Sequence, residues 1–269
     1  MALTAPKKRK LVLIKLVFRV FGVIPLCDKY ATMQVALSEI ETFMCDYGAH
    51  HSLVIYPYMP LIIFDFDNCL APGNSVGEDI LLPLFDVIES DKSNDLTPSM
   101  RQEMRLDFWR KPLDYIVEKY KFSEHSKSAS YTYFSQLSIA HPIEGYEDTH
   151  LVHAFEGVKL LVTSGFQKFQ HSKIRQLGVE GAFEDIYYDD PGNPPRKGKA
   201  FYFDIIAKKY NTAPSEVWVI GDSEESEISA GNSLGMKTVQ ILRPGVKKSP
   251  KAQFHVSSLQ EFLSLVQMS

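Results

Sequence analysis

The clearest hydrophobic pattern in the chain is a series of short, uninterrupted apolar runs. The first run, Leu-Ile-Ile-Phe at 61–64, is typical of a strand that is buried on both faces of a parallel sheet. Comparable runs predict strands at 158–162, 186–188, 217–220, 238–242 and 254–256. Helical spacing predicts helices at 167–177, 200–210, 225–234 and 259–266. Strands that alternate with helices indicate a doubly wound parallel sheet, a Rossmann-like α/β core.

The stretch between the first two predicted strands has a different pattern. Its apolar residues fall at helical spacing, and no strand-like alternation appears. Thr97 followed by Pro98 is typical of a helix N-terminus. We therefore expect an inserted helical domain at 74–141, with 59–73 and 142–269 as the α/β core.

Residues 1–58 form an N-terminal extension. A helical pattern lies within 28–58, and a basic run at 7–10 precedes an apolar stretch that Lys15 and Arg19 interrupt. That stretch is too short and too charged to predict a membrane-spanning helix. It leaves nuclear, organellar and membrane-surface targeting open, including membrane association through residues 7–27. A surface extension without a targeting role is an equal alternative.

Composition narrows the cellular setting. The net charge of −4 gives no general indication of a nucleic-acid partner. The 3 cysteines are widely spaced and predict neither a disulfide framework nor a zinc site, which favours a reducing, cytoplasmic compartment. The oligomeric state is left open.

Polar residues follow three of the predicted strands. They are Asp65 with Asp67, Thr163 with Ser164, and Asp222 with Ser223. The carboxyl ends of parallel strands meet at one edge of the sheet, where ligands bind. Asp65 and Asp67, two positions apart, are expected on the same side of an extended strand, where they repel each other unless a cation is present. An exposed acidic turn is the alternative, but with Asp222 nearby the set favours Mg²⁺ held by oxygen ligands.

These residue types suit phosphoryl transfer. One aspartate can attack phosphorus and form an aspartyl-phosphate, while the second moves a proton. Thr163 and a lysine from the Arg-Lys-Gly-Lys segment at 196–199 can bind the phosphoryl oxygens. A solvated basic turn is the alternative for that segment.

The motifs resemble those of the haloacid dehalogenase-like (HAD) hydrolase superfamily, over roughly residues 61–266. The sequence Asp-Phe-Asp-Asn-Cys-Leu at 65–70 resembles the first motif, which implies Asp65 as the nucleophile and Asp67 as the general acid/base. Thr163, with Ser164 behind it, resembles the second motif. The insertion after the first motif resembles that of the helical-cap subclass.

The third and fourth motifs follow in order. Lys197 resembles the third-motif lysine, because Phe203 lies six residues later and matches a common aromatic of that helix; Lys199 is the alternative. The Gly-Asp-Ser sequence at 221–223 resembles the fourth motif. The resemblance implies that Thr163, Ser164 and Lys197 bind the substrate phosphate. The implied metal ligands are Asp65, Asp67, Asp222 and Glu227.

Two positions depart from the family pattern. Cys69 stands where threonine or valine is usual, and this position is mainly structural. Glu227 stands where a second aspartate is usual, and its longer side chain can still reach a metal directly or through water. The alternative is that Glu227 is a surface residue of the acidic run 224–227, which would weaken the metal site.

The second aspartate, Asp67, argues for phosphate-ester chemistry, since the dehalogenases and phosphonatases of the superfamily lack it. We therefore expect a magnesium-dependent phosphomonoester hydrolase that acts on a small phosphorylated metabolite through an aspartyl-phosphate on Asp65. The alternatives are a sugar phosphomutase of the same superfamily and a catalytically weak binding protein on this fold.

Overall fold

The structure, a computed structural model, describes residues 59–268. The helix expected within 28–58 and the basic and apolar segments before it lie outside the described residues. In the part that is described, no helix has the length and hydrophobicity needed to cross a membrane.

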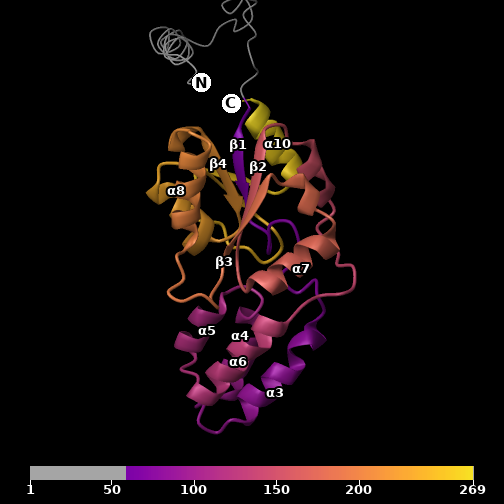
Figure 1. Cartoon of the computed structure of the whole chain (residues 1–269), viewed down its shortest axis with the longest axis vertical. Helices are drawn as coiled ribbons and strands as arrows, with labels where there is room; N and C mark the ends of the chain where they lie inside the picture. The colour runs from indigo at the N-terminus through magenta and orange to yellow at the C-terminus, as the bar shows by residue number, and fades with distance from the viewer. Residues whose placement is uncertain (1–58, 269) are drawn as a thin grey trace, which may run out of the picture. The chain divides into compact units, whose positions relative to one another are not determined.

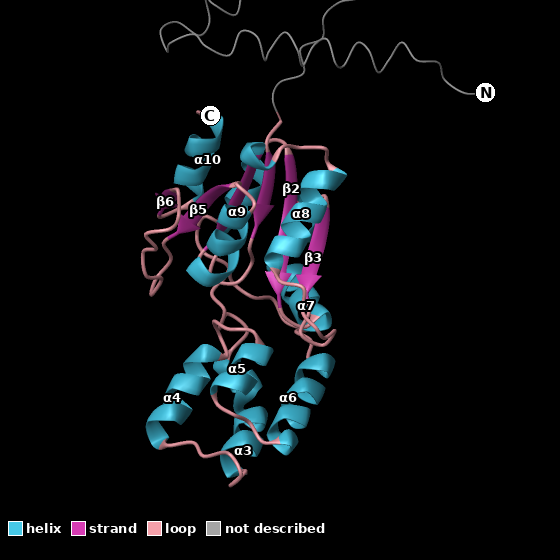
Figure 2. Cartoon of the chain, turned by 90° about the vertical axis from the view of Figure 1, so that its left-hand side faces the viewer, coloured by secondary structure: helices cyan, strands magenta, loops and turns pink. Residues whose placement is uncertain are grey.

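Six parallel strands form the central sheet of the described residues, in the order β3-β2-β1-β4-β5-β6; Figure 1 labels β1 to β4, and Figure 2 labels β5 and β6. They are β1 (Leu61–Phe64), β2 (Val158–Ser164), β3 (Asp185–Asp189), β4 (Val217–Gly221), β5 (Lys237–Ile241) and β6 (Phe254–Val256). The first strand lies inside the sheet because Leu61 pairs with Val158 on one side and with Val217 on the other. All six predicted strands are present, and their bounds differ from the prediction by at most two residues.

Helices cover both faces of the sheet. They are α7 (Gln167–Leu177) and α10 (Leu259–Gln267) on one face, and α8 (Lys199–Lys209) and α9 (Ser229–Ser233) on the other. Phe64 of β1 packs against Phe262 of α10, with ring centroids 5.9 Å apart. The preceding residue, Ile63, points to the opposite face and shares a core with Phe203 of α8. Adjacent residues that are both buried explain why the strand is apolar without alternation.

One helix differs from the prediction. The sequence predicts a continuous helix at 225–234, whereas the structure has a π-helical turn, Glu224–Ile228, that leads into the short α9. Short 3₁₀ helices complete the described elements: η1 (Glu78–Leu81), η2 (Thr149–Ala154), η3 (Glu180–Ala182) and η4 (Pro214–Glu216).

Four helices lie between β1 and β2, beyond the carboxyl ends of the strands (Figure 2). They are α3 (Leu82–Ser90), α4 (Pro98–Asp107), α5 (Leu113–Lys119) and α6 (Glu124–Gln136). Thr97 caps α4, as expected, by accepting a hydrogen bond from the backbone N–H of Met100 at 3.3 Å. All four helices fall inside the predicted insertion, whose outer limits at 74 and 141 stay a prediction.

Candidate active site

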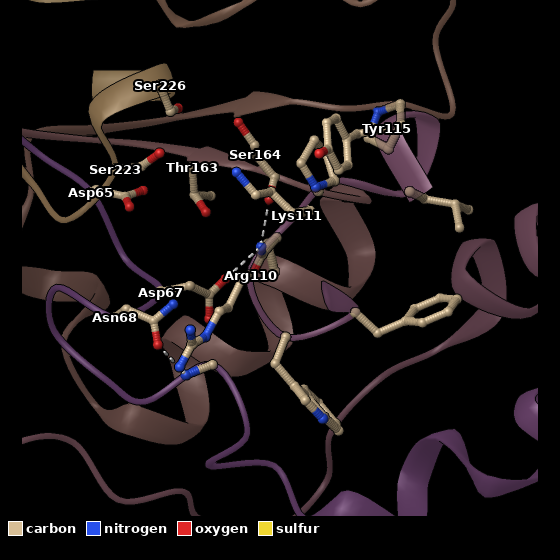
Figure 3. Close-up of a pocket in the computed structure, with 18 of the residues that line it drawn as sticks. Asp65, Asp67, Asn68, Arg110, Lys111, Tyr115, Thr163, Ser164, Ser223 and Ser226 are labelled. Carbon is tan, nitrogen blue, oxygen red and sulfur yellow. Dashed lines mark hydrogen bonds between the residues drawn. The ribbon is translucent and has the colours of Figure 1, made fainter. Parts of the chain in front are cut away.

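A cavity of about 390 Å³ lies where the carboxyl ends of the strands meet the inserted helices (Figure 3). The α/β core contributes the polar residues Asp65, Asp67, Thr163, Ser164 and Asp222 to its lining. The inserted domain contributes the segment 108–113 and parts of α5 and α6. The structure therefore brings the sequence-predicted aspartates and hydroxyl residues into one pocket.

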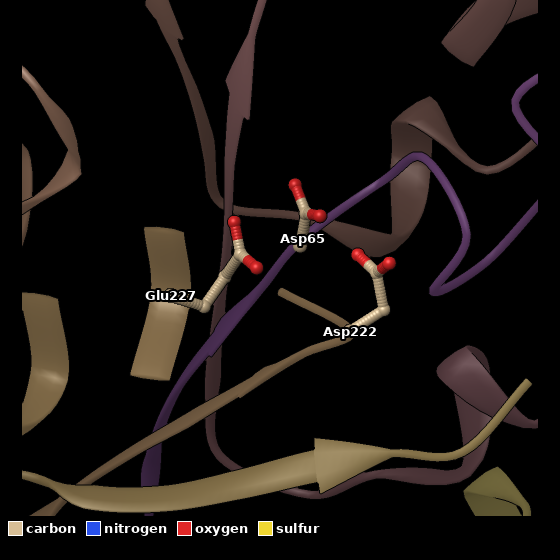
Figure 4. A group of neighbouring side chains, drawn as sticks. All are labelled: Asp65, Asp222 and Glu227. Carbon is tan, nitrogen blue, oxygen red and sulfur yellow. The ribbon is translucent and has the colours of Figure 1, made fainter. Parts of the chain in front are cut away.

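Three carboxylates gather at the floor of this pocket (Figure 4). Asp65, Asp222 and Glu227 each place an oxygen within 4.8 Å of the other two. Glu227 is only 2% exposed, so the alternative that it is a surface residue of an acidic run is wrong. The extra methylene of glutamate is accommodated, and the carboxylate joins the two aspartates.

Backbone geometry explains how Glu227 reaches the site. The π-helical turn Glu224–Ile228 begins directly after Ser223, whose backbone N–H donates a hydrogen bond to Glu227 Oε2 at 3.0 Å. The side chain lies across Gly221, where an added Cβ would lie 2.3 Å from Glu227 Cγ. Glycine is therefore required at 221 because the glutamate occupies the space that any side chain would need.

Lys199 supplies the ammonium group at this cluster. Its Nζ donates to Asp65 Oδ1 at 2.5 Å and also to Glu227 Oε1. The prediction that Lys197 holds this position is wrong: the Lys197 ammonium lies 5.8 Å from the ring centroid of Phe201, and Lys197 does not line the pocket. The helix α8 begins at Lys199, so Lys199 and Phe203, four residues apart, share its buried face, whereas Lys197 precedes the helix.

The acidic cluster is electrostatically strained without a cation. Burial, together with the neighbouring Glu227, raises the pKa of Asp65 to about 7 against the opposing effect of Lys199. Burial and Glu227 also raise the pKa of Asp222 well above its usual range. Burial alone would lower the pKa of Lys199, but Asp65 and Glu227 together raise it. One ammonium group does not balance three carboxylates, of which Asp65 and Glu227 are buried and Asp222 is half-buried, so the site favours a further positive charge.

Asp67 does not join the acidic cluster, which corrects the prediction that its side chain is a metal ligand beside Asp65. Its carboxylate accepts a hydrogen bond from Gln170 Nε2 at 2.9 Å and forms an ion pair with Lys173. Gln170 and Lys173 both lie on α7. The rule that residues two apart share a side fails here because β1 ends at Phe64. Asp67 already belongs to the turn that follows, in which Asn68 has a φ of 56°.

Gln170 and Lys173 were not found from the sequence. Gln170 Nε2 also donates to the backbone oxygen of Ser164 at 2.8 Å, and the Lys173 side chain is only 3% exposed. The sequence did contain an indication of a buried lysine, because Lys173 lies between Phe169 and Ile174 on the apolar face of the predicted helix. A buried lysine needs a carboxylate, and in the structure Asp67 provides it.

The remaining predicted residues lie on β2. Thr163 is 1% exposed and lines the pocket together with Asp65 (Figure 3). Ser164 also lines the pocket, and its hydroxyl donates to Asp189 Oδ2 at 3.4 Å. Both residues therefore line the pocket, and their role in binding the substrate phosphate stays a prediction.

Ion pairs connect the inserted domain to the core at the pocket. Lys111 Nζ lies 2.6 Å from Glu225 Oε2. Arg196 Nε lies 2.8 Å from Asp114 Oδ2 of α5, while its Nη1 pairs with Asp189 at the end of β3. These contacts hold the α5 side of the insertion over the strand ends.

Comparison with known proteins agrees with this geometry. The haloacid dehalogenase-like hydrolase family matches residues 59–235, which include every residue of the acidic cluster and Lys199. The chain belongs to this family. It is 27% identical over 117 residues to the glyceraldehyde 3-phosphate phosphatase of Methanocaldococcus jannaschii. That match covers 41% of this chain and half of the relative's length.

Solved structures of the family share the fold. A HAD phosphatase from Thermococcus onnurineus has a TM-score of 0.53 at 19% identity, covering 77% of this chain and 98% of its own. The magnesium-bound HAD-hydrolase YfnB of Bacillus subtilis has a TM-score of 0.54 at 17% identity, with the same coverage of 77% and 98%. At these identities the likeness establishes the Rossmann-like core and the inserted helical domain.

Proposed function

We propose that the protein is a magnesium-dependent phosphomonoester hydrolase that forms an aspartyl-phosphate on Asp65. The observation that carries this proposal is that the two carboxylates lie in separate surroundings. Asp65 lies in the acidic cluster with Lys199, and Asp67 lies outside that cluster with Lys173. A nucleophile next to a cation site and a separate proton carrier are what a two-step phosphoryl transfer needs. The phosphatase named among the relatives supports the same reaction class.

The residues fit Mg²⁺. Asp65, Asp222 and Glu227 offer oxygen ligands only, which suits a hard cation, and their carboxylates outnumber the single ammonium group of Lys199 beside them. Mg²⁺ bound there would neutralise the carboxylates and the phosphoryl oxygens and thereby lower the repulsion that an anionic nucleophile meets.

In the first step, an oxygen of Asp65 attacks the phosphorus atom and the bond from phosphorus to the leaving oxygen breaks. Protonated Asp67 gives its proton to that oxygen, so that a neutral alcohol departs. The Lys173 ammonium then stabilises the Asp67 carboxylate that remains. Thr163 and Lys199, both almost fully buried at the pocket floor, donate hydrogen bonds to the phosphoryl oxygens.

In the second step, water attacks the phosphorus atom of the aspartyl-phosphate. Asp67 takes a proton from this water, and the bond between phosphorus and Asp65 breaks, which releases phosphate and restores the starting carboxylate. The inserted domain covers the pocket and limits access of bulk water to the intermediate. A cavity of about 390 Å³ suits a small phosphorylated metabolite.

Two alternatives were raised by the sequence. The weak-binding alternative depended on Glu227 lying at the surface, and its burial removes that support. A sugar phosphomutase would use the same aspartyl-phosphate but return the phosphoryl group to the sugar, so analysis of the products distinguishes it from a hydrolase.

The test is phosphate release from a panel of small phosphate esters by the purified protein, with and without Mg²⁺. We expect Mg²⁺-dependent release that Asp65→Asn abolishes, while Asp204→Asn, which alters an exposed carboxylate on α8, leaves it unchanged. Brief reaction and acid quenching should trap phosphate on the wild-type chain but not on Asp65→Asn. No release from any ester, with or without Mg²⁺, would overturn the proposal.

A further inference from the structure

The cations that line the pocket differ in whether they have a carboxylate partner. Lys111, Lys173, Arg196 and Lys199 each form an ion pair with a carboxylate. Arg110 lines the same pocket, yet its guanidinium forms no ion pair with any residue in the range 59–268. Among the cations that line the pocket, Arg110 is therefore the one that has no carboxylate partner within the described residues.

Arg110 is carried by the inserted domain but extends to the core. It lies in the segment between α4 and α5, and Figure 3 shows its side chain extending toward Asp67 and Asn68. The tip also approaches the loop after β5, since an added Cβ at Gly245 would lie 3.0 Å from Arg110 Nη2. The guanidinium is thus placed near the proton carrier and away from the acidic cluster that contains Asp65.

We propose that Arg110 binds a second anionic group of the substrate, so that the protein prefers phosphate monoesters whose alcohol part carries a carboxylate or a second phosphate. This inference rests on the proposed function. Because Asp67 gives its proton to the leaving oxygen, the alcohol part lies on the Asp67 side of the phosphorus atom, which is the side that Arg110 occupies.

The chemistry of arginine suits this role. A guanidinium presents several N–H donors in one plane and binds carboxylate or phosphate through paired hydrogen bonds. The neighbouring Lys111 is not free to bind a substrate anion in the same way, because its ammonium group forms an ion pair with Glu225 at 2.6 Å. A charged hydrogen bond inside a pocket commonly contributes enough to change affinity by about tenfold or more.

Three substrates of equal chain length test the proposal. Phosphoglycolate carries a carboxylate, ethylene glycol bisphosphate carries a second phosphate, and 2-hydroxyethyl phosphate is neutral beyond its phosphoryl group. We expect wild-type kcat/KM to be at least about tenfold higher for one of the anionic substrates than for the neutral one. Which anionic substrate is preferred distinguishes the two sources of the second charge.

Arg110→Gln should remove this preference, mainly through a higher KM, and leave the neutral substrate within about twofold of wild type. Arg110 is exposed, so the variant is expected to fold. Arg175→Gln, which alters an exposed arginine outside the pocket lining, is the matched control. An equal loss on all three substrates, or no wild-type preference, would overturn the proposal.

Binding to the inactive Asp65→Asn variant separates this proposal from the proposed function. Calorimetry with the three esters and Mg²⁺ should show the same anion preference, and adding Arg110→Gln should abolish it. If that preference appears but the wild-type chain hydrolyses none of the esters, the hydrolase proposal fails and the Arg110 subsite stands. If hydrolysis occurs without any preference, the subsite fails and the hydrolase stands.

Discussion

Lowering the pH from 8 to 6 is expected to weaken Mg²⁺ binding by about tenfold. In the absence of a cation, burial and Glu227 raise the pKa of Asp65 to about 7. Asp65 is therefore about 90% protonated at pH 6 and about 10% protonated at pH 8. Because the cation binds the carboxylate, the proton must leave first, and the apparent affinity falls by the ratio of the two ionised fractions. Tenfold corresponds to about 1.4 kcal/mol.

The stability of the cation-free protein should change in the matching direction. A carboxyl group whose pKa is raised on folding binds more protons in the folded chain than in the unfolded chain between about pH 4 and pH 7. The cation-free protein therefore loses stability as pH rises through this window. Mg²⁺ offsets that loss, so the rise in Tm on adding Mg²⁺ should be larger at pH 8 than at pH 6.

Isothermal titration calorimetry with Mg²⁺ at pH 6, 7 and 8 measures the affinity, and thermal melts with and without Mg²⁺ at the same pH values measure the rise in Tm. Repeating each titration in buffers with different ionisation enthalpies counts the protons released, which should be close to one at pH 6 and close to zero at pH 8 from Asp65 alone. Asp222, whose pKa is also raised, would steepen the dependence, so tenfold is the lower limit. A wild-type affinity that stays constant between pH 6 and pH 8 would refute the reasoning.

Three further predictions concern single residues. Lys199→Met should lower kcat by about 100-fold or more, whereas Lys197→Met should stay within about twofold, as steady-state kinetics on one ester will show. Lys173→Met should reduce hydrolysis of an alkyl phosphate by about 100-fold but that of p-nitrophenyl phosphate by less than tenfold. The reason is that the alkyl alcohol is a poor leaving group and needs a proton from Asp67, whereas nitrophenolate does not. Equal losses on the two substrates would contradict this. Gly221→Ala should cost about 1–3 kcal/mol of stability, since the new Cβ collides with Glu227, and a Tm equal to wild type in a thermal melt would exclude that collision.

The sheet was predictable because its strands are buried on both faces. A run such as Leu61–Phe64 has no polar position that could face water, so its length and place follow directly from the apolar pattern. The positions of Asp65, Thr163 and Asp222 then follow from parallel topology, which places the ends of β1, β2 and β4 side by side.

The errors arose where a short-range rule met an irregular backbone. The alternation rule was applied to Asp67 beyond the last residue of β1, so its turn toward α7 was missed. Choosing between Lys197 and Lys199 required the first residue of α8, and helix bounds are the least certain part of sequence-based prediction. The π-helical turn that carries Glu227 inward has no clear sequence pattern, although Gly221 marks the space that it needs.

The inserted domain is attached to the core differently along its two edges. On the α6 side, the Phe134 ring stacks on Phe166, with centroids 5.7 Å apart, and meets Phe169 of α7 at 5.9 Å. On the α5 side, the contacts with the core include the ion pairs of Lys111 and Arg196. Dissolved salt screens exposed charges but does not weaken contacts between aromatic rings. Rising ionic strength should therefore loosen the α5 edge first while the α6 edge stays in place and acts as the hinge.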